Sequence, residues 1–574
     1  MKKVISIILC IAIMLPCLGI NAYADMSATM NARYERKMRL VTELFREDKE
    51  TLEAVEACGR AVVFISVSDT MNQATTVYSS TGKDLDATLD KAFQKARLTG
   101  VNPVWFKLDV VTEIEEISYE DFKEKYAGKL GNSMRKGIAF NSYFGRALLE
   151  AQINSSGYMN YETGELDLDA INKYFKKAKK KQLAEIPETL YLFKTKGYFS
   201  DTPAGARDLY DSEYAAFGTR KYDYSPEMME KLAGKTSRYL ADMVNEEGKF
   251  VYGYYPIDNE ELEGYNIIRH AGTTWNLILQ YEMTGDKSLI APIDRALSYL
   301  DTYLHYKDKN TAFLNDRGTL NVGGNGISLL AYVCYAEVMK SDKYNDTIKA
   351  LANGIIYMQK EDGGYIHTLR KADYSVYKEY IVVFYDGEAT YGLLKAYGLL
   401  GTKKYLRAAE KAADYFIANN YEELHSHWIA YSFNELTKYT PKEEYFNFGL
   451  LNVHGYTDKV HRTVSAAHTT CETMGATFEL YVRMKELGIE CDILDDFDEE
   501  MLFKAFSRRV KYGLHYFIQP EQAMYFVNPR LVLNSFVVRE DAFRIRIDDI
   551  QHFMGGYYLY WKNYDTVQQY LNKQ

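Results

Sequence analysis

The chain has 574 residues, of which 47% are hydrophobic and 26% are charged, and its formal net charge is −10. This length favours two domains, and the apolar share is enough for large cores. The negative charge and the absence of a basic run argue against nucleic acid as a partner. Tyrosine is abundant, with 51 residues. Its apolar ring can stack on the face of a sugar and its hydroxyl can form hydrogen bonds in a solvated cleft, although packing between helices explains any single tyrosine equally well.

The N-terminus has the pattern of a secretory signal. Two lysines precede an apolar run at residues 4–20, and the small-x-small tripeptide Ala-Tyr-Ala ends at Ala24. We therefore predict that residues 1–24 are a signal peptide and that the mature chain is secreted or extracytoplasmic. Cys17 has a poor lipoprotein context, which favours release over lipid anchoring. No later stretch approaches the roughly 20 apolar residues that span a bilayer, so we do not expect a membrane-spanning segment.

Residues 26–224 have a mixed pattern. Apolar runs at 61–67 and 104–111 predict buried strands, and helical spacing predicts a helix at 84–97. No chemical motif occurs here, so we expect an α+β accessory domain of unknown role. Irregular cysteine spacing fits no metal ribbon or disulfide scaffold, and one or two disulfides remain open among the four cysteines beyond the signal: Cys58, Cys334, Cys471 and Cys491.

From residue 225 onward the pattern changes to paired helices. Odd-numbered members carry a one-sided apolar stripe, whereas even-numbered members are apolar almost all round, as at 327–338. Alternation of half-buried and buried helices predicts two concentric rings, and six pairs close a toroid over 225–574. The twelve predicted helices lie near 225–245, 266–283, 287–306, 326–341, 344–360, 386–400, 404–419, 426–438, 442–455, 469–487, 498–517 and 548–564.

The even-numbered, inner helices begin with polar residues. In a toroid the inner N-termini open on one face, so these starts should converge on one cleft where helix dipoles favour negative charge. Helix capping explains residues such as Asp386 and Asp548 without any function. It does not explain the repeated histidine, arginine and tryptophan at the same places.

The helix pairing resembles the six-hairpin glycosidase superfamily. A further shared feature is the turn Gln359-x-x-Asp362-Gly363-Gly364-Tyr365. The resemblance covers about Ser225 to Asn572 and implies an (α/α)6 toroid of six helical hairpins, a fold that also houses related lyases and sugar epimerases. Terpene cyclases and prenyltransferases of similar shape share the turn, so it indicates architecture rather than chemistry. Site residues must therefore come from the chemistry of this sequence.

Breaking a glycosidic bond commonly requires two carboxyl groups. We expect Asp386 or Glu388 to face Asp548 or Asp549 across the cleft, although capping and ion pairing remain open for each. Histidine acts as a general acid or base near neutral pH, or it is a hydrogen-bonded core residue. The candidate catalytic residues at the inner starts are Asp386, Glu388, Glu472, Asp548, Asp549, His270 and His427.

Residues that bind the substrate are expected beside them. Arginine grips carboxylates with two-pronged geometry, so an acidic glycan is one possible substrate. His-x-His on a helix does not place two ligands on one face. A zinc site built from His425, His427, His468 or Cys471 is therefore not favoured, and no metal or cofactor is expected. The candidate binding residues are Arg269, His468, Trp428, His552, Arg546, Tyr254 and Asn325.

Three functions fit this pattern. The leading expectation is a secreted carbohydrate-active enzyme that hydrolyses glycosidic bonds of an envelope or environmental polysaccharide. The first alternative is a polysaccharide lyase or uronyl epimerase, in which histidine or tyrosine removes a proton and arginine stabilises the developing charge. The second alternative is a non-catalytic glycan-binding or scaffold protein, whose stacking platforms would be Trp275, Trp428, Tyr252, Tyr254 and Tyr255.

Overall fold

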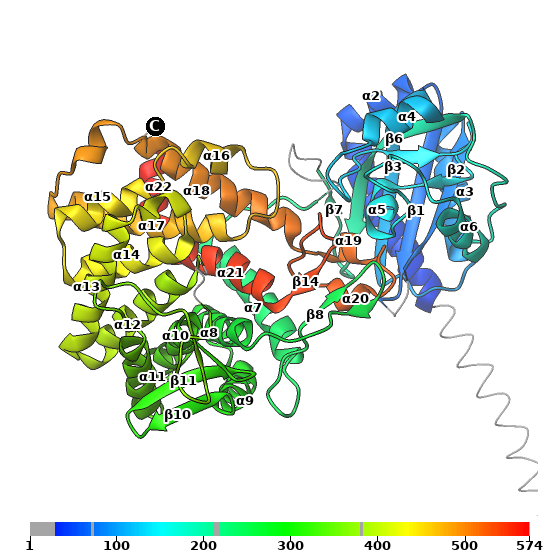
Figure 1. Cartoon of the computed structure of the whole chain (residues 1–574). Coiled ribbons are helices and arrows are strands. Elements are labelled where there is room, and N and C mark those ends of the chain that lie inside the picture. Colours follow the sequence, from blue (N-terminus) through cyan, green and yellow to red (C-terminus); the bar gives the residue numbers. More distant parts are fainter. Residues whose placement is uncertain (1–28, 71–73, 211–218, 379–382, 573–574) are drawn as a thin grey trace, which may run out of the picture.

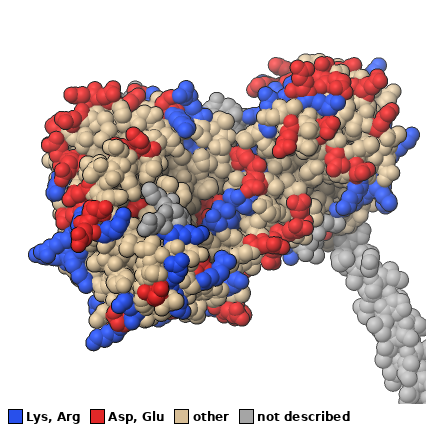
Figure 2. All heavy atoms as spheres, viewed as in Figure 1, with Lys and Arg blue, Asp and Glu red and all other residues tan. Residues whose placement is uncertain are grey.

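The computed structural model of the chain describes residues 29–70, 74–210, 219–378 and 383–572. A lobe built around a β-sheet is followed along the chain by a larger helical lobe (Figure 1). The predicted signal peptide lies outside the described residues. Within those residues, we find no helix that combines the length and the apolar character needed to cross a membrane. Acidic and basic side chains are intermixed over the face drawn in Figure 2.

The N-terminal lobe contains a seven-stranded antiparallel sheet in the order β2-β1-β3-β6-β4-β5, with β7 paired to β6. The strands predicted at 61–67 and 104–111 correspond to β1 and to the first half of β3. The strands are β1 Ala61–Ser68, β2 Thr76–Gly82, β3 Trp105–Ser118, β4 Gly137–Ala139, β5 Ala147–Leu148, β6 Thr189–Ser200 and β7 Arg207–Asp208.

Both faces of this sheet are covered, which explains why every residue of β1 is buried. Val63 and Ile65 pack with the helical residues 29–47 and with α3, the helix predicted at 84–97. Val62 and Phe64 point to the opposite face and join the core of the helical lobe. The helices of this lobe after residue 47 are α2 Lys49–Ala57, α3 Leu85–Arg97, α4 Tyr119–Tyr126, α5 Glu150–Ser155 and α6 Leu168–Lys177.

The helical lobe has an inner ring of six helices. Each packs against the next along the chain, and the last packs against the first, so the ring closes. The predicted toroid is therefore confirmed. The inner helices are α8 Ile267–Thr284, α10 Val322–Met339, α12 Tyr385–Leu400, α14 His427–Tyr439, α17 Thr469–Leu487 and α21 Ile547–Lys562.

Each inner helix packs against the outer helix that precedes it. The predicted helix at 287–306 is too long at its C-terminal end. It stops at Asp301 because the chain turns into strand β10, Leu304–Asp308. The outer helices are α7 Pro226–Asp242, α9 Ile290–Asp301, α11 Asn345–Tyr357, α13 Lys403–Ala418, α15 Glu443–Leu451 and α18 Glu499–Gly513. Two shorter helices are α16 Thr457–Arg462 and α22 Tyr564–Asn572.

The segments that connect helices of the toroid form two small sheets. One has the order β10-β11-β12-β13 and the other the order β14-β8-β9. Their remaining strands are β8 Gly253–Tyr255, β9 Glu260–Glu261, β11 Thr311–Asp316, β12 Thr319–Asn321, β13 Thr368–Arg370 and β14 Ile545–Arg546. Because β14 leads directly into α21, the second sheet fixes the start of the last inner helix.

The chain between α18 and α21 connects the two lobes. It forms α19 (Pro520–Ala523) and α20 (Pro529–Val532), which lie beside the N-terminal sheet (Figure 1). Tyr525 donates a hydrogen bond of 2.9 Å to Ser66 in β1. Arg220 forms two bonds of 2.7 Å with Glu521. The four cysteines of the described residues are unbridged.

Candidate active site

A cavity of about 400 Å³ lies where the inner helices begin. All six inner helices contribute to its wall, so the polar helix starts converge on one cleft as the sequence predicts. The lining residues are Asn266, Ile268, Arg269, Gly272, Ile327, Phe384, Tyr385, Glu388, His427, Trp428, His468, Thr469, Arg546, Asp548, Gln551 and His552.

Two glycines leave room for polar side chains at this end of the ring. A Cβ at Gly323 would lie 2.2 Å from Oε2 of Glu388, and one at Gly272 would lie 2.4 Å from Oε1 of Gln551. Both distances are far below van der Waals contact, so any larger residue would displace its neighbour. Gln551 and Tyr385 line the cavity but were not predicted. In the sequence, the adjacent Gly323 and Gly324 at the start of the buried helix α10 were a sign that residues pack closely at this point.

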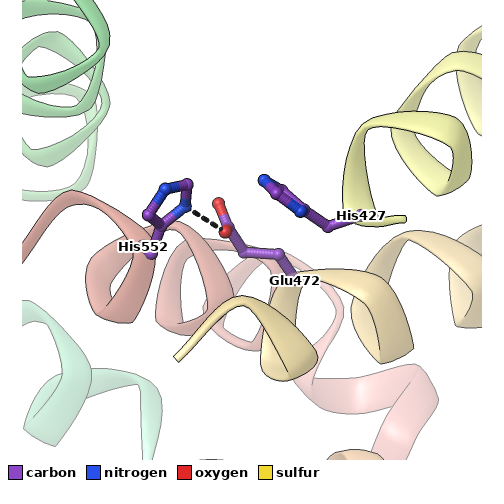
Figure 3. A group of neighbouring side chains, drawn as sticks. All are labelled: His427, Glu472 and His552. Carbon is purple, nitrogen blue, oxygen red and sulfur yellow. Dashed lines mark hydrogen bonds and ion pairs between the residues drawn. The ribbon is translucent and has the colours of Figure 1, made fainter. Parts of the chain in front are cut away.

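Three side chains from three inner helices meet beside the cavity (Figure 3). His427 opens α14, Glu472 lies in the first turn of α17, and His552 lies in the second turn of α21. Nδ1 of His552 contacts Oε2 of Glu472 at 2.6 Å, and the hydroxyl of Tyr431 donates to Oε1 of Glu472 at 3.1 Å. Both carboxylate oxygens are thus occupied, and the His552 ring is held by a fixed partner.

The two histidines of this group have opposite pKa shifts. Burial, together with the charges of His552 and His468, lowers the pKa of His427 well below its usual value. Burial also opposes a charge on His552, but the Glu472 carboxylate outweighs it and raises the pKa of His552. The surroundings thus favour the neutral form of His427 and the protonated form of His552. Nε2 of His427 is buried without a hydrogen-bond partner in the described chain.

Arginines neutralise the two aspartates of α21. Asp548 contacts Nε of Arg269 at 3.0 Å and Nε of Arg546 at 2.5 Å. Burial favours the neutral acid, but these arginines outweigh it and lower the pKa of Asp548. Asp549 is gripped by Arg544 with two bonds of 3.0 and 3.1 Å. Asp548 lines the cavity, whereas Asp549 lies behind it.

The two carboxyl groups at the start of α12 have different surroundings. Asp386 is buried and contacts Nε2 of His367 at 2.9 Å, so it is held away from the cavity. Glu388 lines the cavity, and burial together with the nearby charge of Asp386 raises its pKa to about 8. Of the expected carboxylate pairings, only Glu388 and Asp548 line the same cavity.

Several expected site residues serve the fold instead. His270 is fully buried, donates from Nε2 to the carbonyl of Ala296 at 2.8 Å, and accepts at Nδ1 from Tyr265 at 2.7 Å. Burial lowers its pKa to about 4, so it is a neutral structural residue. The assignment of His270 as a catalytic residue is therefore corrected. Its position at a helix start does not turn its ring toward the cavity.

Two predicted binding residues are also outside the cavity wall. The side-chain amide of Asn325 donates to the carbonyls of Ala312 and Leu351, at 3.0 and 3.1 Å, which ties α10 to its neighbours. Tyr254 pairs with Ile545 between strands β8 and β14. By contrast, Arg269, Trp428, His468, Arg546 and His552 all line the cavity, as predicted.

The group of His427, Glu472 and His552 has the ligand types and spacing of a metal site. One candidate ligand atom from each residue lies within 4.8 Å of the other two. However, Glu472 already accepts hydrogen bonds at both oxygens, and Nδ1 of His552 serves as the donor in one of them. Only the Nδ1 atom of His552 is committed as a donor, because each carboxylate oxygen keeps a second lone pair. The three residues could therefore hold a cation or act as an acid–base pair.

No protein-family model matches this sequence, and no curated protein matches it. Among solved structures, the chain is similar to a D-mannose isomerase, with 13% identity, a TM-score of 0.47, and coverage of 60% of this chain and 100% of that one. A heparin-specific unsaturated glucuronyl hydrolase matches with 13% identity, a TM-score of 0.43, and coverage of 60% and 98%. A cellobiose 2-epimerase from Bacillus thermoamylovorans matches with 11% identity, a TM-score of 0.46, and coverage of 58% and 99%.

These proteins belong to the six-hairpin glycosidase superfamily, which is the family that the sequence resembles. At such low identities and TM-scores, the likeness by itself carries no argument about the fold or the reaction of this chain. The closed ring of helices in this chain is the direct observation of the toroid.

Proposed function

We propose that the chain is a carbohydrate-active enzyme that transfers a proton next to the carbonyl group of an open-chain sugar, with His427 as the base and His552 as the acid. The observation that carries this proposal is a pair of histidines, adjacent in one cavity, with opposite pKa shifts. Environments that push two neighbouring pKa values apart mark acid and base roles.

The spacing of the two rings favours one type of proton transfer. Their centroids are 5.1 Å apart, which leaves no room for a sugar between them. Both therefore face the same side of a bound substrate. Inversion at one carbon by two residues needs them on opposite faces of that carbon. Transfer between neighbouring carbons needs one base on a single face, with an acid near the two oxygens. We therefore favour aldose–ketose isomerisation over epimerisation.

The residues fit each step of this reaction. His427 takes the proton from C2, the electron pair forms the C1–C2 double bond, and the carbonyl oxygen takes a proton from His552. The resulting enediol returns its O2 proton to His552, and C1 receives the proton held by His427. Glu472, itself held by a hydrogen bond from Tyr431, fixes Nδ1 of the His552 ring, so that its other nitrogen is available to the substrate.

A hydrolase remains the second candidate because Glu388 and Asp548 line the same cavity with opposite preferences for the proton. One protonated and one ionised carboxyl group are the usual parts of a glycosidase. Two arginines neutralise Asp548, which weakens it as a nucleophile or base. Because of these two contacts, we favour proton transfer over the hydrolysis that the sequence predicts.

The test is to incubate the purified chain in D₂O with D-mannose, D-glucose, D-fructose, cellobiose and an unsaturated uronyl disaccharide. The proton held by His427 can exchange with the solvent before it returns to carbon. Proton transfer therefore predicts deuterium at carbon and a new sugar isomer in the NMR spectrum, both lost in His427→Asn and His552→Asn. His454→Asn is the matched control, because this histidine lies outside the cavity with Asp496 at 3.4 Å. New reducing ends without carbon-bound deuterium would instead support hydrolysis.

We also propose that the enzyme acts outside the cytoplasm, on the basis of the N-terminal signal pattern. N-terminal sequencing of the protein recovered from a secreting host should begin at Asp25. A recovered chain that still begins at Met1 would contradict export with cleavage.

A further inference from the structure

Glu388 differs from the other carboxylates around the cavity. Four of them have a cationic or imidazole partner: Asp386, Glu472, Asp548 and Asp549. Glu388 lines the cavity with 7% of its surface exposed, and its Oε2 is buried without a hydrogen-bond partner within the described ranges. Its carboxyl group thus lines the cavity and is not committed to a partner at Oε2.

The surroundings of Glu388 keep its carboxyl group neutral. Burial and the charge of Asp386 raise its pKa to about 8, against the opposing effect of His552. Gly323 leaves the space in which Oε2 lies. A neutral carboxylic acid has an O–H group and can donate a hydrogen bond, whereas a carboxylate can only accept.

Two oxygens of the substrate need donors in the proposed reaction, one on C1 and one on C2. His552 serves the two in turn, because it protonates one and later takes the proton of the other. Its fixed contact with Glu472 restricts its reach, so one oxygen is without its help at each step. Glu388 and His552 line the same cavity from opposite sides of the ring, on α12 and α21. A donor on α12 would therefore approach a bound substrate from the side opposite His552.

We propose that Glu388 remains a carboxylic acid during turnover and donates a hydrogen bond to the second substrate oxygen as negative charge develops on it. This role rests on the proposed function. The proton of Glu388 is not transferred, so the atom balance of the reaction is unchanged. Preorganised donors of this kind stabilise the charge that forms in the transition state.

The first test compares Glu388→Gln with Glu388→Ala on whichever sugar shows carbon-bound exchange. The glutamine amide keeps a donor of the same length but cannot ionise or transfer a proton. We expect Glu388→Gln to retain activity within about tenfold and Glu388→Ala to lose about a hundredfold, the effect of removing one such donor. Equal inactivity of both variants, with native thermal unfolding, would overturn the donor role.

The second test needs no substrate. Infrared difference spectra of the wild type and Glu388→Gln at pH 6.5 should show a protonated carboxyl band that belongs to Glu388 and disappears by pH 9.5. Glu337→Gln is the control, because Glu337 is ion-paired with Lys395 at 3.1 Å at the other end of the ring. The absence of the band from the wild type at pH 6.5 would overturn the proposal. If no sugar exchanges, the proposed function fails, and this spectrum still decides the state of Glu388.

Discussion

The two ends of the helical ring contain similar residues in different arrangements. At the C-terminal end of the inner helices, a pocket of about 180 Å³ contains ion pairs. These pairs join Lys395 to Glu337, Lys438 to Glu435 and Lys562 to Glu479, at 3.1, 2.5 and 3.3 Å. At the N-terminal end, the buried polar atoms without a hydrogen-bond partner within the described residues include three from titratable side chains: Nε2 of His427, Nδ1 of His468 and Oε2 of Glu388.

This difference separates a structural end from a chemical end. Burying a polar atom without a partner costs free energy. Because the polar groups of the ion pairs at the C-terminal end have partners, the unpartnered atoms at the N-terminal end require an explanation. Unpaired titratable groups with shifted pKa values are typical of functional sites. The comparison predicts loss of activity from changes at the N-terminal end and loss of stability from changes at the C-terminal end.

The largest effect is expected for His427→Asn. Removal of a general base should lower kcat about a thousandfold, within the usual range for acid–base catalysis. The free energy of unfolding should change little, because Nε2 of His427 has no partner to lose in the described chain. Turnover and urea unfolding of the variant measure both effects. If His427→Asn turns over as fast as the control variant His454→Asn, the assignment of chemistry to the N-terminal end is contradicted.

Glu388→Gln should stabilise the fold at alkaline pH. The pKa of Glu388 rises from 4.5 in the unfolded chain to about 8 in the folded one, so the wild type loses stability as the pH rises through this range. Glutamine lacks this loss. At pH 8 the variant should be more stable by about 2–4 kcal/mol, and at pH 4 by almost nothing. Urea unfolding at both pH values measures the difference, and an equal effect at both would contradict the raised pKa.

Glu435→Gln, at the C-terminal end of the ring, should lose stability and retain activity. Glu435 is buried and contacts both Lys438 and Tyr439. Loss of the charge should cost about 2 kcal/mol of unfolding free energy, since bonds to charged groups are of that size. Activity of the folded variant should stay within about twofold of the wild type. A large loss of kcat without loss of stability would assign chemistry to this end as well.

Tyr431→Phe tests the residue that connects the two ends. Tyr431 lines the C-terminal pocket, and its hydroxyl donates to Glu472. Removal of this bond should lower kcat about tenfold with little change in KM, because one bond that positions Glu472 and His552 is lost. Steady-state kinetics at several pH values measure the effect. A change in KM alone would argue against a positioning role.

Treatment with a metal chelator should have the smallest effect. The proposed proton transfer uses only His427 and His552, so we expect activity to be unchanged after dialysis against EDTA. Loss of activity with EDTA and recovery with a divalent cation would show that His427, Glu472 and His552 bind a metal.

The sequence predicted the ring better than the cavity wall. Apolar periodicity located all twelve helices and the polar starts, because burial on every side leaves a clear pattern. It did not predict which starting residues face inward. His270 and Arg269 are adjacent, but only Arg269 lines the cavity, because successive residues point about 100° apart around a helix and packing fixes the rotation. Gln551 was missed because glutamine alone carries no chemical signal.

The central claim is that His427 and His552 form an acid–base pair with opposite protonation states. The most direct measurement is a ¹⁵N NMR titration of histidine-labelled protein, with assignment by His427→Asn and His552→Asn. The expected result at pH 7 is a neutral His427 and a protonated His552. If both rings titrate together near pH 6.5, the value of an ordinary histidine, the account is contradicted.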